Sequence, residues 1–127
     1  MINASSLSAN CGYTRFVSAG NLITEIVALY QRHGWTLREA LLRAETKAAT
    51  TSLDELGISK VRDSNFDALW FSRSSHENRE AWELRLISEQ AYALFEAFEA
   101  DETEEDREEA RLDMENRMRE HVGAARE

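Results

Sequence analysis

The stretch "FDALWFSRSSHENREAWELRL", residues 66–86, constrains the fold most, because two alternating apolar runs flank one polar turn. If the chain reverses about His76, Trp70 lies opposite Trp82 on one face of a two-stranded ribbon. A one-residue slip would turn the apolar side chains of one strand to the wrong side, so the pattern predicts a β-hairpin. The other expected pairs are Phe66 with Leu86, Ala68 with Leu84, Asp67 with Arg85, Leu69 with Glu83, and Phe71 with Ala81.

A long helix from Asn78 onward is the rival interpretation of the same residues. The segment "REAWELRLISEQ" contains good helix formers and neither glycine nor proline. Leu84, Ile87 and Ala91 also follow helical spacing, so periodicity alone leaves both structures open.

Two helices are expected before this stretch. Residues 21–34 show apolar side chains at helical spacing, with Asn21 as a possible N-cap and Gly34 as the stop. In the next segment, Thr36 and Glu39 have the spacing of a capping box. The short connection predicts an antiparallel hairpin of helices with Trp35 at its corner.

The remaining elements complete an α+β prediction. Residues 58–62 have the short alternating pattern of an edge strand, and residues 88–100 fit a helix better than a strand, which Glu96 would interrupt. A charged helix follows, with Thr103 as N-cap, Asp106 completing a capping box and Gly123 as its end. The sequence therefore predicts an N-terminal helical hairpin, a small antiparallel sheet of two or three strands, and two C-terminal helices. Residues 1–20 are expected to form a flexible arm, and residues 21–127 a single domain.

Charge and cysteine content exclude several classes of partner. The chain carries a net charge of −9 and only two lysines, which disfavours binding to nucleic acid or to anionic lipid. No apolar run approaches the roughly 20 residues that span a bilayer, and no membrane association is expected. The single cysteine, Cys11, excludes an internal disulfide, and the expected location is the cytoplasm.

Catalytic and metal-binding patterns are absent from the sequence. The three histidines lie far apart in the chain, and no HExxH, glycine-rich phosphate loop, GxSxG or paired-cysteine motif occurs. The segment "SSHEN" is interpreted as a solvated loop and not as an activated serine. No catalytic residue, metal or cofactor is assigned, and a non-catalytic protein is favoured over an enzyme.

The acidic segment "DETEEDREE", residues 101–109, has seven carboxylates in nine positions. One interpretation is a solvated face whose carboxylates favour the helix dipole, with i,i+4 pairs from Asp113 to Arg117 and from Glu115 to Arg119. A second is a binding surface for a basic protein. A divalent-cation site is disfavoured, because the glycine-centred loop of calcium sites is missing. The thin apolar stripe behind this segment docks either on the chain itself or on another protein.

These observations predict a small acidic interaction module that binds a basic or complementary protein, for example an inhibitor or immunity-type protein masking a basic toxin or nuclease. The alternatives are a homodimeric structural protein, and a small-ligand sensor or enzyme with a pocket near Arg73, His76 or Arg85. The expected binding surface combines the hairpin's second face with the last helix. It consists of Asp67, Leu69, Phe71, Glu83, Arg85, Glu104, Glu105, Glu108, Met114 and Met118.

Overall fold

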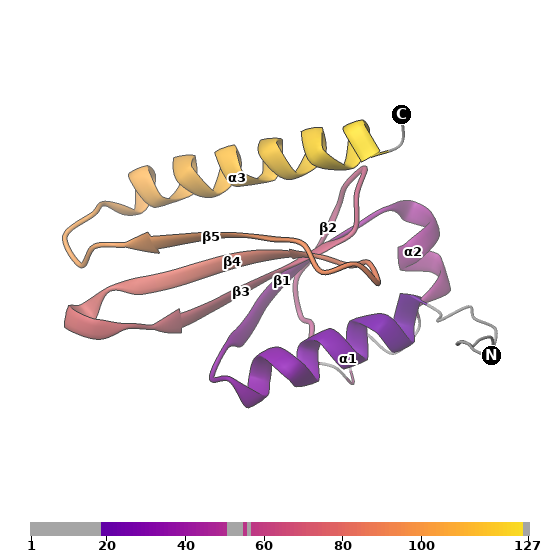
Figure 1. The fold of residues 1–127 in the computed structure, drawn as a ribbon, viewed down its shortest axis with the longest axis horizontal. Helices are drawn as coiled ribbons and strands as arrows, with labels where there is room; N and C mark the ends of the chain where they lie inside the picture. The colour runs from indigo at the N-terminus through magenta and orange to yellow at the C-terminus, as the bar shows by residue number, and fades with distance from the viewer. Residues whose placement is uncertain (1–18, 51–54, 56, 126–127) are drawn as a thin grey trace.

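A five-stranded mixed sheet, in the order β2-β1-β3-β4-β5, forms the centre of the computed structural model, which describes residues 19–50, 55 and 57–125 (Figure 1). Helix α1 covers one face of this sheet and helix α3 the other. β1 and β2 are parallel, and the other neighbouring strands are antiparallel. The elements are α1 (Ala19–Arg32), β1 (Thr36–Leu42), α2 (Ala44–Ala49), β2 (Val61–Asp63), β3 (Ala68–Ser74), the 3-10 turn η1 (His76–Asn78), β4 (Glu80–Leu86), β5 (Ala93–Phe98) and α3 (Glu104–Ala125).

The predicted architecture is therefore wrong in four respects. The sheet has five strands instead of two or three, and it is mixed and not purely antiparallel because β1 and β2 run parallel. A single helix follows it, and the N-terminal hairpin of helices does not form. Of the expected arm, residues 19 and 20 belong to α1, while residues 1–18, including Cys11, lie outside the described residues. No helix in the described part of the chain is both long and apolar enough to cross a membrane.

The segment expected to be the second helix is divided between β1 and the short helix α2. β1 lies between β2 and β3, so both of its edges are paired. Its consecutive residues Ala40, Leu41 and Leu42 are all buried, because Ala40 and Leu42 face the core beneath α1 and Leu41 faces the core beneath α3. A continuous apolar run is typical of such a central strand, and it also satisfies helical spacing. Pairing with two distant strands decides between the two structures.

The hairpin of β3 and β4 is confirmed, but its register differs from the expected one by two residues. Trp70 lies opposite Leu84, and Trp82 lies opposite Ser72. The turn is centred on Glu77 and not on His76, and Glu77 and Asn78 adopt positive φ angles of 60° and 62° within it. A shift of two residues keeps every side chain on its expected face. The two indoles still meet diagonally, edge to face, with ring centroids 5.8 Å apart.

The segment expected to form the first C-terminal helix contains strand β5, at the edge of the sheet. Leu94 and Glu96 face the same side, with Leu94 opposite Leu84 and Glu96 opposite Trp82. Glu96 interrupts the apolar alternation, and it is accommodated because its side chain is only partly buried at this edge. β2 forms the other edge, which confirms an edge strand near residues 58–62, although it is short and begins at Val61.

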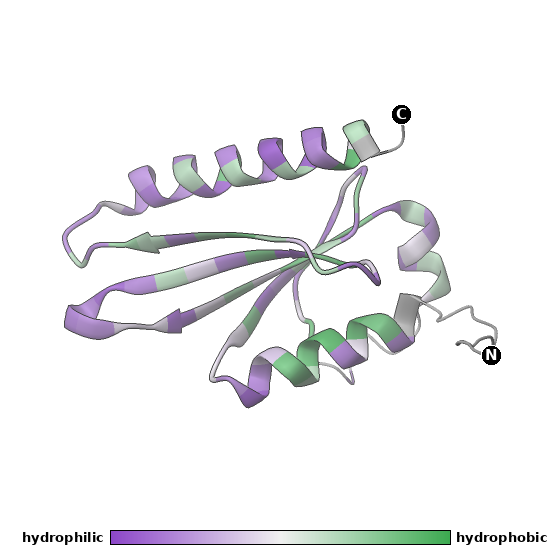
Figure 2. Cartoon of the chain, in the orientation of Figure 1, coloured by the Kyte–Doolittle hydropathy of each residue, from purple (hydrophilic) through white to green (hydrophobic). Residues whose placement is uncertain are grey.

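Two separate apolar cores lie on the two faces of the sheet. The core beneath α1 includes Ile23, Ile26 and Val27 of the helix, packed on Leu69 and Phe71 of β3. The core beneath α3 joins the helix's methionines to the opposite face of the sheet. Figure 2 shows the matching contrast: apolar residues are frequent in α1, whereas α3 is mostly hydrophilic. The limited apolar surface of α3 determines how much of the sheet it can cover.

Candidate binding groove

α3 is fixed on the sheet by a cap and by two buried methionines. The backbone N–H of Asp106 donates to Oγ1 of Thr103 over 3.1 Å, which confirms Thr103 as the N-cap, whereas Gly123 lies inside the helix. Met114 and Met118 have no exposed surface and pack with Phe66 and the indole of Trp70. These contacts hold the middle of α3 over part of the sheet and leave the area beside β1 open.

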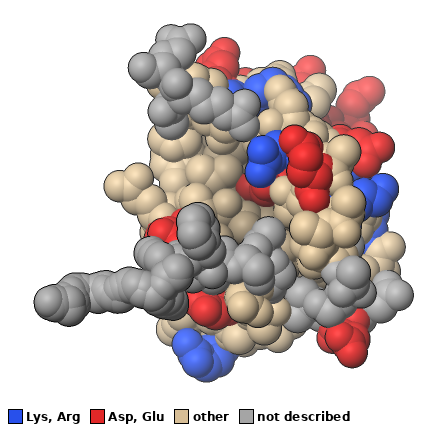
Figure 3. Space-filling view, turned by 90° about the vertical axis from the view of Figure 1, so that its right-hand side faces the viewer, with Lys and Arg blue, Asp and Glu red and all other residues tan. Residues whose placement is uncertain are grey.

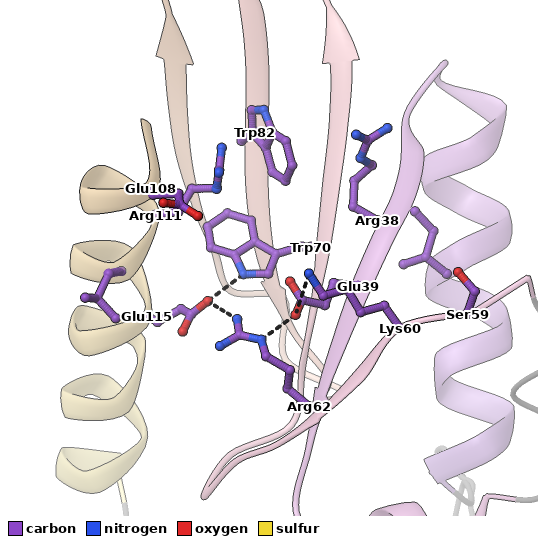
Figure 4. Close-up of a pocket in the computed structure, with 12 residues that line it drawn as sticks. Arg38, Glu39, Ser59, Lys60, Arg62, Trp70, Trp82, Glu108, Arg111 and Glu115 are labelled. Carbon is purple, nitrogen blue, oxygen red and sulfur yellow. Dashed lines mark hydrogen bonds and ion pairs between the residues drawn. The ribbon is translucent and has the colours of Figure 1, made fainter. Parts of the chain in front are cut away.

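A groove of about 780 Å³ lies between α3 and the β1–β2 edge of the sheet (Figure 4). Its floor contains Trp70 and Trp82. Arg38 and Lys60 lie on the side of β1 and β2, and Glu108 and Leu112 lie on the side of α3. Three of the four basic residues that line the groove, Arg38, Lys60 and Arg62, lie on this β1–β2 wall, in a protein whose net charge is −9.

An ion-pair network crosses the deep end of this groove. Glu115 is 7% exposed and accepts a hydrogen bond of 2.9 Å from the indole N–H of Trp70. Arg62 donates to Glu115 of α3 and to Glu39 of β1 (Figure 4). Burial alone would lower the pKa of Arg62, but the hydrogen bonds to Glu115 and Glu39 outweigh it and raise that pKa above its usual value. The permanently charged guanidinium thus ties the two walls together.

A β-bulge shapes the β1 wall. Leu37 pairs with Phe71 and Glu39 pairs with Trp70, so β1 has one extra residue, Arg38, between them. A classic bulge directs two consecutive side chains to the same face, and bulges are frequent beside functional sites. Both Arg38 and Glu39 consequently line the groove.

Two arginines from opposite walls stack on the same indole. The guanidinium carbon of Arg111 lies 4.4 Å from the ring centroid of Trp82, and that of Arg38 lies 5.5 Å from it. Arg111 also pairs with Glu104 over 2.6 Å. Arg38 has no carboxylate partner among the described residues, so the hydrogen-bonding edge of its guanidinium is free to bind one.

The outward side of α3 carries Glu105, Glu108, Glu109 and Leu112, which we call the acidic stripe. Residues at these spacings of three and four share one side of a helix. All four are exposed, and Leu112 retains 57% of its surface. The opposite end of the molecule, where α3 finishes, instead shows acidic and basic side chains side by side (Figure 3).

The arginines in this half of α3 turn inward. Arg107 pairs with Glu80 over 3.1 Å, and Arg111 lies over Trp82. Their side chains are only 16% and 17% exposed. Of the expected surface residues, Glu104, Glu105 and Glu108 are thus exposed, while Met114 and Met118 belong to the core. The expected pair of Asp113 with Arg117 forms over 3.1 Å, whereas Glu115 pairs with Arg62 and not with Arg119.

The second face of the hairpin is covered by α1 and does not provide an open surface. Leu69 and Phe71 are completely buried, and Tyr30 of α1 stacks on Phe71 with ring centroids 4.2 Å apart. Glu83 accepts a hydrogen bond from the Tyr30 hydroxyl, and the buried Arg85 donates to the carbonyl of Leu86. These residues hold α1 against the sheet.

Asp67 anchors α2, and the expected Asp67–Arg85 pair is wrong. Its carboxylate accepts hydrogen bonds from the backbone N–H of Arg43 over 2.8 Å and from the Thr46 hydroxyl over 2.7 Å. It also pairs with the Arg43 guanidinium over 3.0 Å, which raises the pKa of Arg43. Arg85 lies opposite Leu69 instead. Asp67 thus ties Arg43, the residue before α2, and Thr46 within α2 to the start of β3.

The buried hydroxyl of Tyr30 makes stability depend on pH in the alkaline range. Burial, and then the hydrogen bond and charge of Glu83, raise the pKa of Tyr30 far above its ordinary value near 10. Because the folded pKa is the higher one, this contribution to stability is complete below pH 10 and falls as the pH rises further, by at most about 1.4 kcal/mol per pH unit. Urea unfolding between pH 8 and 11 should show a flatter alkaline decline for Tyr30→Phe than for the wild type. Parallel curves for the two proteins would contradict this assignment.

The groove residues were missed because they are far apart in the chain and individually unremarkable. Arg38 and Glu39 fall in a segment that also fits a helix, so their side-by-side placement has no signature in the sequence. Among the described residues, no cluster of three or more histidines, cysteines and carboxylates is arranged to hold a metal. Arg73 bonds to the carbonyl of His33, and neither Arg73, His76 nor Arg85 lines the groove.

Comparison of the chain with protein-family models, with curated proteins and with solved structures found no match.

Proposed function

We propose that this protein is a non-catalytic interaction module, and that a basic protein partner docks on the acidic stripe of α3. The observation that carries the proposal is the segregation of charge on this helix. Its outward side presents Glu105, Glu108 and Glu109 around an exposed leucine, while Arg107 and Arg111 turn inward. An inhibitor or immunity-type protein that masks a basic toxin or nuclease is the concrete version of this role.

Energetics support a role for this arrangement beyond solubility. Glu105 and Glu109 are four residues apart, as are Glu104 and Glu108, and like charges at this spacing destabilise a helix by about 0.2–0.5 kcal/mol per pair. Arg111 compensates Glu104, but Glu105, Glu108 and Glu109 make no ion pair within the described residues. A basic partner would relieve this repulsion, and complementary charges would also accelerate the encounter.

The exposed Leu112 supplies the apolar centre that such a surface needs. Interfaces combine an apolar anchor with a polar rim, and the anchor contributes most of the affinity. Leu112 is 57% exposed, lies one turn beyond Glu108, and borders the groove. The partner expected here therefore presents basic side chains around an apolar contact.

Affinity capture from lysate of the native host, compared across matched variants, tests the proposal. Leu112→Lys should reduce the recovery of the partner more than tenfold, because it removes the anchor and adds a repelling charge. Leu29→Lys is the control: Leu29 is 41% exposed on α1, on the other side of the sheet, and its replacement should change nothing. Recovery by the wild type should also fall as salt rises.

Two double variants of equal net charge test whether the acidic stripe itself, and not the net charge of the protein, attracts the partner. The double substitution Glu105→Lys and Glu109→Lys changes the net charge by as much as Glu25→Lys with Glu45→Lys, and all four side chains are exposed. Only the first should abolish capture. Equal losses in both would show that net charge and not this surface attracts the partner, and retention of the same proteins by Leu112→Lys would refute the proposal.

A further inference from the structure

The face of the sheet that carries α3 has room for a second protein element beside the helix. Five strands about 4.8 Å apart span roughly 19 Å, whereas a helix covers about 10 Å. α3 packs along one side of this face, and the groove occupies the other. The floor and walls of the groove are held by the Arg62 network and need no ligand to form.

The two walls of the groove carry opposite, available charges. On the β1 side, Arg38 has no carboxylate partner within the described residues. The side chain of Lys60 is 68% exposed. Its Nζ lies 3.9 Å from a carboxylate oxygen of Glu39, and that carboxylate already binds Arg62. On the α3 side, Glu108 makes no ion pair within the described part of the chain, and Leu112 beside it is exposed.

We infer that a second copy of this chain docks across the groove. A two-fold axis over the floor sets the α3 wall of each copy against the β1 wall of the other. Glu108 of each copy then pairs with Arg38 and Lys60 of its partner, and Leu112 covers the opposite floor. A surface with both signs of charge and an apolar centre is self-complementary, as a two-fold interface requires.

The charges of the groove indicate that its occupant is a second copy of this chain. The chain is strongly acidic overall, so two copies repel each other unless a local basic wall meets a local acidic one. The groove provides that wall, because the β-bulge directs Arg38 toward it. An interface of this kind dissociates as salt rises, whereas a purely apolar contact would strengthen.

Light scattering on the purified full chain tests the inference. The wild type should reach twice the mass of one chain as concentration rises, and should return to a monomer at high salt. Arg38→Glu should weaken the dimer at least tenfold, because each substitution is present twice across the axis. Lys60→Glu should act in the same direction. Combining Arg38→Glu with Glu108→Arg should restore the dimer, since it exchanges the two charges across the interface.

Matched controls come from cations elsewhere on the surface. Arg32→Glu on α1 and Lys47→Glu on α2 change the charge equally and should leave the dimer unaffected. A wild type that remains monomeric at its highest soluble concentration, or a dimer insensitive to Arg38→Glu, overturns the inference. Glu105 and Glu109 lie outside the groove lining, whereas Leu112 belongs to both surfaces. The substitutions Glu105→Lys with Glu109→Lys should therefore abolish partner capture and leave the dimer intact, while Arg38→Glu should weaken the dimer and leave capture intact, so failure of one proposal can be told from failure of the other.

Discussion

Trp70→Ala should lower the free energy of unfolding by about 3–5 kcal/mol, the range found when a fully buried aromatic side chain is truncated in a core. Trp70 is 1% exposed and belongs to the core beneath α3 together with Met114 and Met118. Its removal leaves a cavity between the helix and the sheet, and it also takes away the indole that donates to Glu115. Chemical denaturation followed by far-UV circular dichroism gives the measurement.

Trp70→Phe separates the two contributions of this indole. The substitution keeps most of the apolar contact but removes the N–H that donates to Glu115 over 2.9 Å. Arg62 still pairs with that carboxylate, so the expected loss is only about 1–2 kcal/mol. Equal losses for the two variants would mean that the hydrogen bond and not the packing stabilises this contact.

The hairpin was predictable because its pattern is local and has a period of two. The faces of β3 and β4 follow from alternation alone, and the two indoles meet as expected. The exact register was not predictable, since it depends on Glu77 and Asn78 adopting positive φ angles in the turn. Such a shift costs no burial when it amounts to two residues.

β1 could not be recognised from the sequence, because a central strand and a buried helix present the same apolar run. Its residues are good helix formers, and Thr36 with Glu39 has the spacing of a helix cap. Pairing with β2 and β3, together with burial of Ala40 and Leu42 in one core and Leu41 in the other, overrides these local preferences. The groove could not be predicted either, because β1 forms one of its walls.

The acidic stripe was partly predictable and the groove was not. A run of carboxylates on a helix is visible in any sequence, and Glu105 and Glu108 are exposed as expected. What the sequence does not contain is the inward turn of Arg107 and Arg111, which depends on Glu80 and Trp82 of a different strand. The separation of charge that supports the proposed function therefore emerges only from tertiary contacts.

Met118→Glu should cost at least about 4 kcal/mol, because it places a carboxylate with no partner in the core where Met118 has no exposed surface. Total stabilities of small domains are only about 5–15 kcal/mol, so α3 should detach or the whole chain should unfold at ordinary temperature. Tryptophan fluorescence reports this directly, since Trp70 lies in the same core.

Leu112→Glu is the matched control for this prediction, six residues earlier on the outward side of the same helix. It introduces the same group at a side chain that is 57% exposed, so stability should change by no more than about 0.5 kcal/mol. Met118→Leu preserves volume and polarity and should cost less than about 1.5 kcal/mol. If Met118→Glu were instead as stable as Leu112→Glu, α3 would not be seated on the sheet through its methionines. Both the groove and the acidic stripe require that seating, because it decides which side of the helix faces outward.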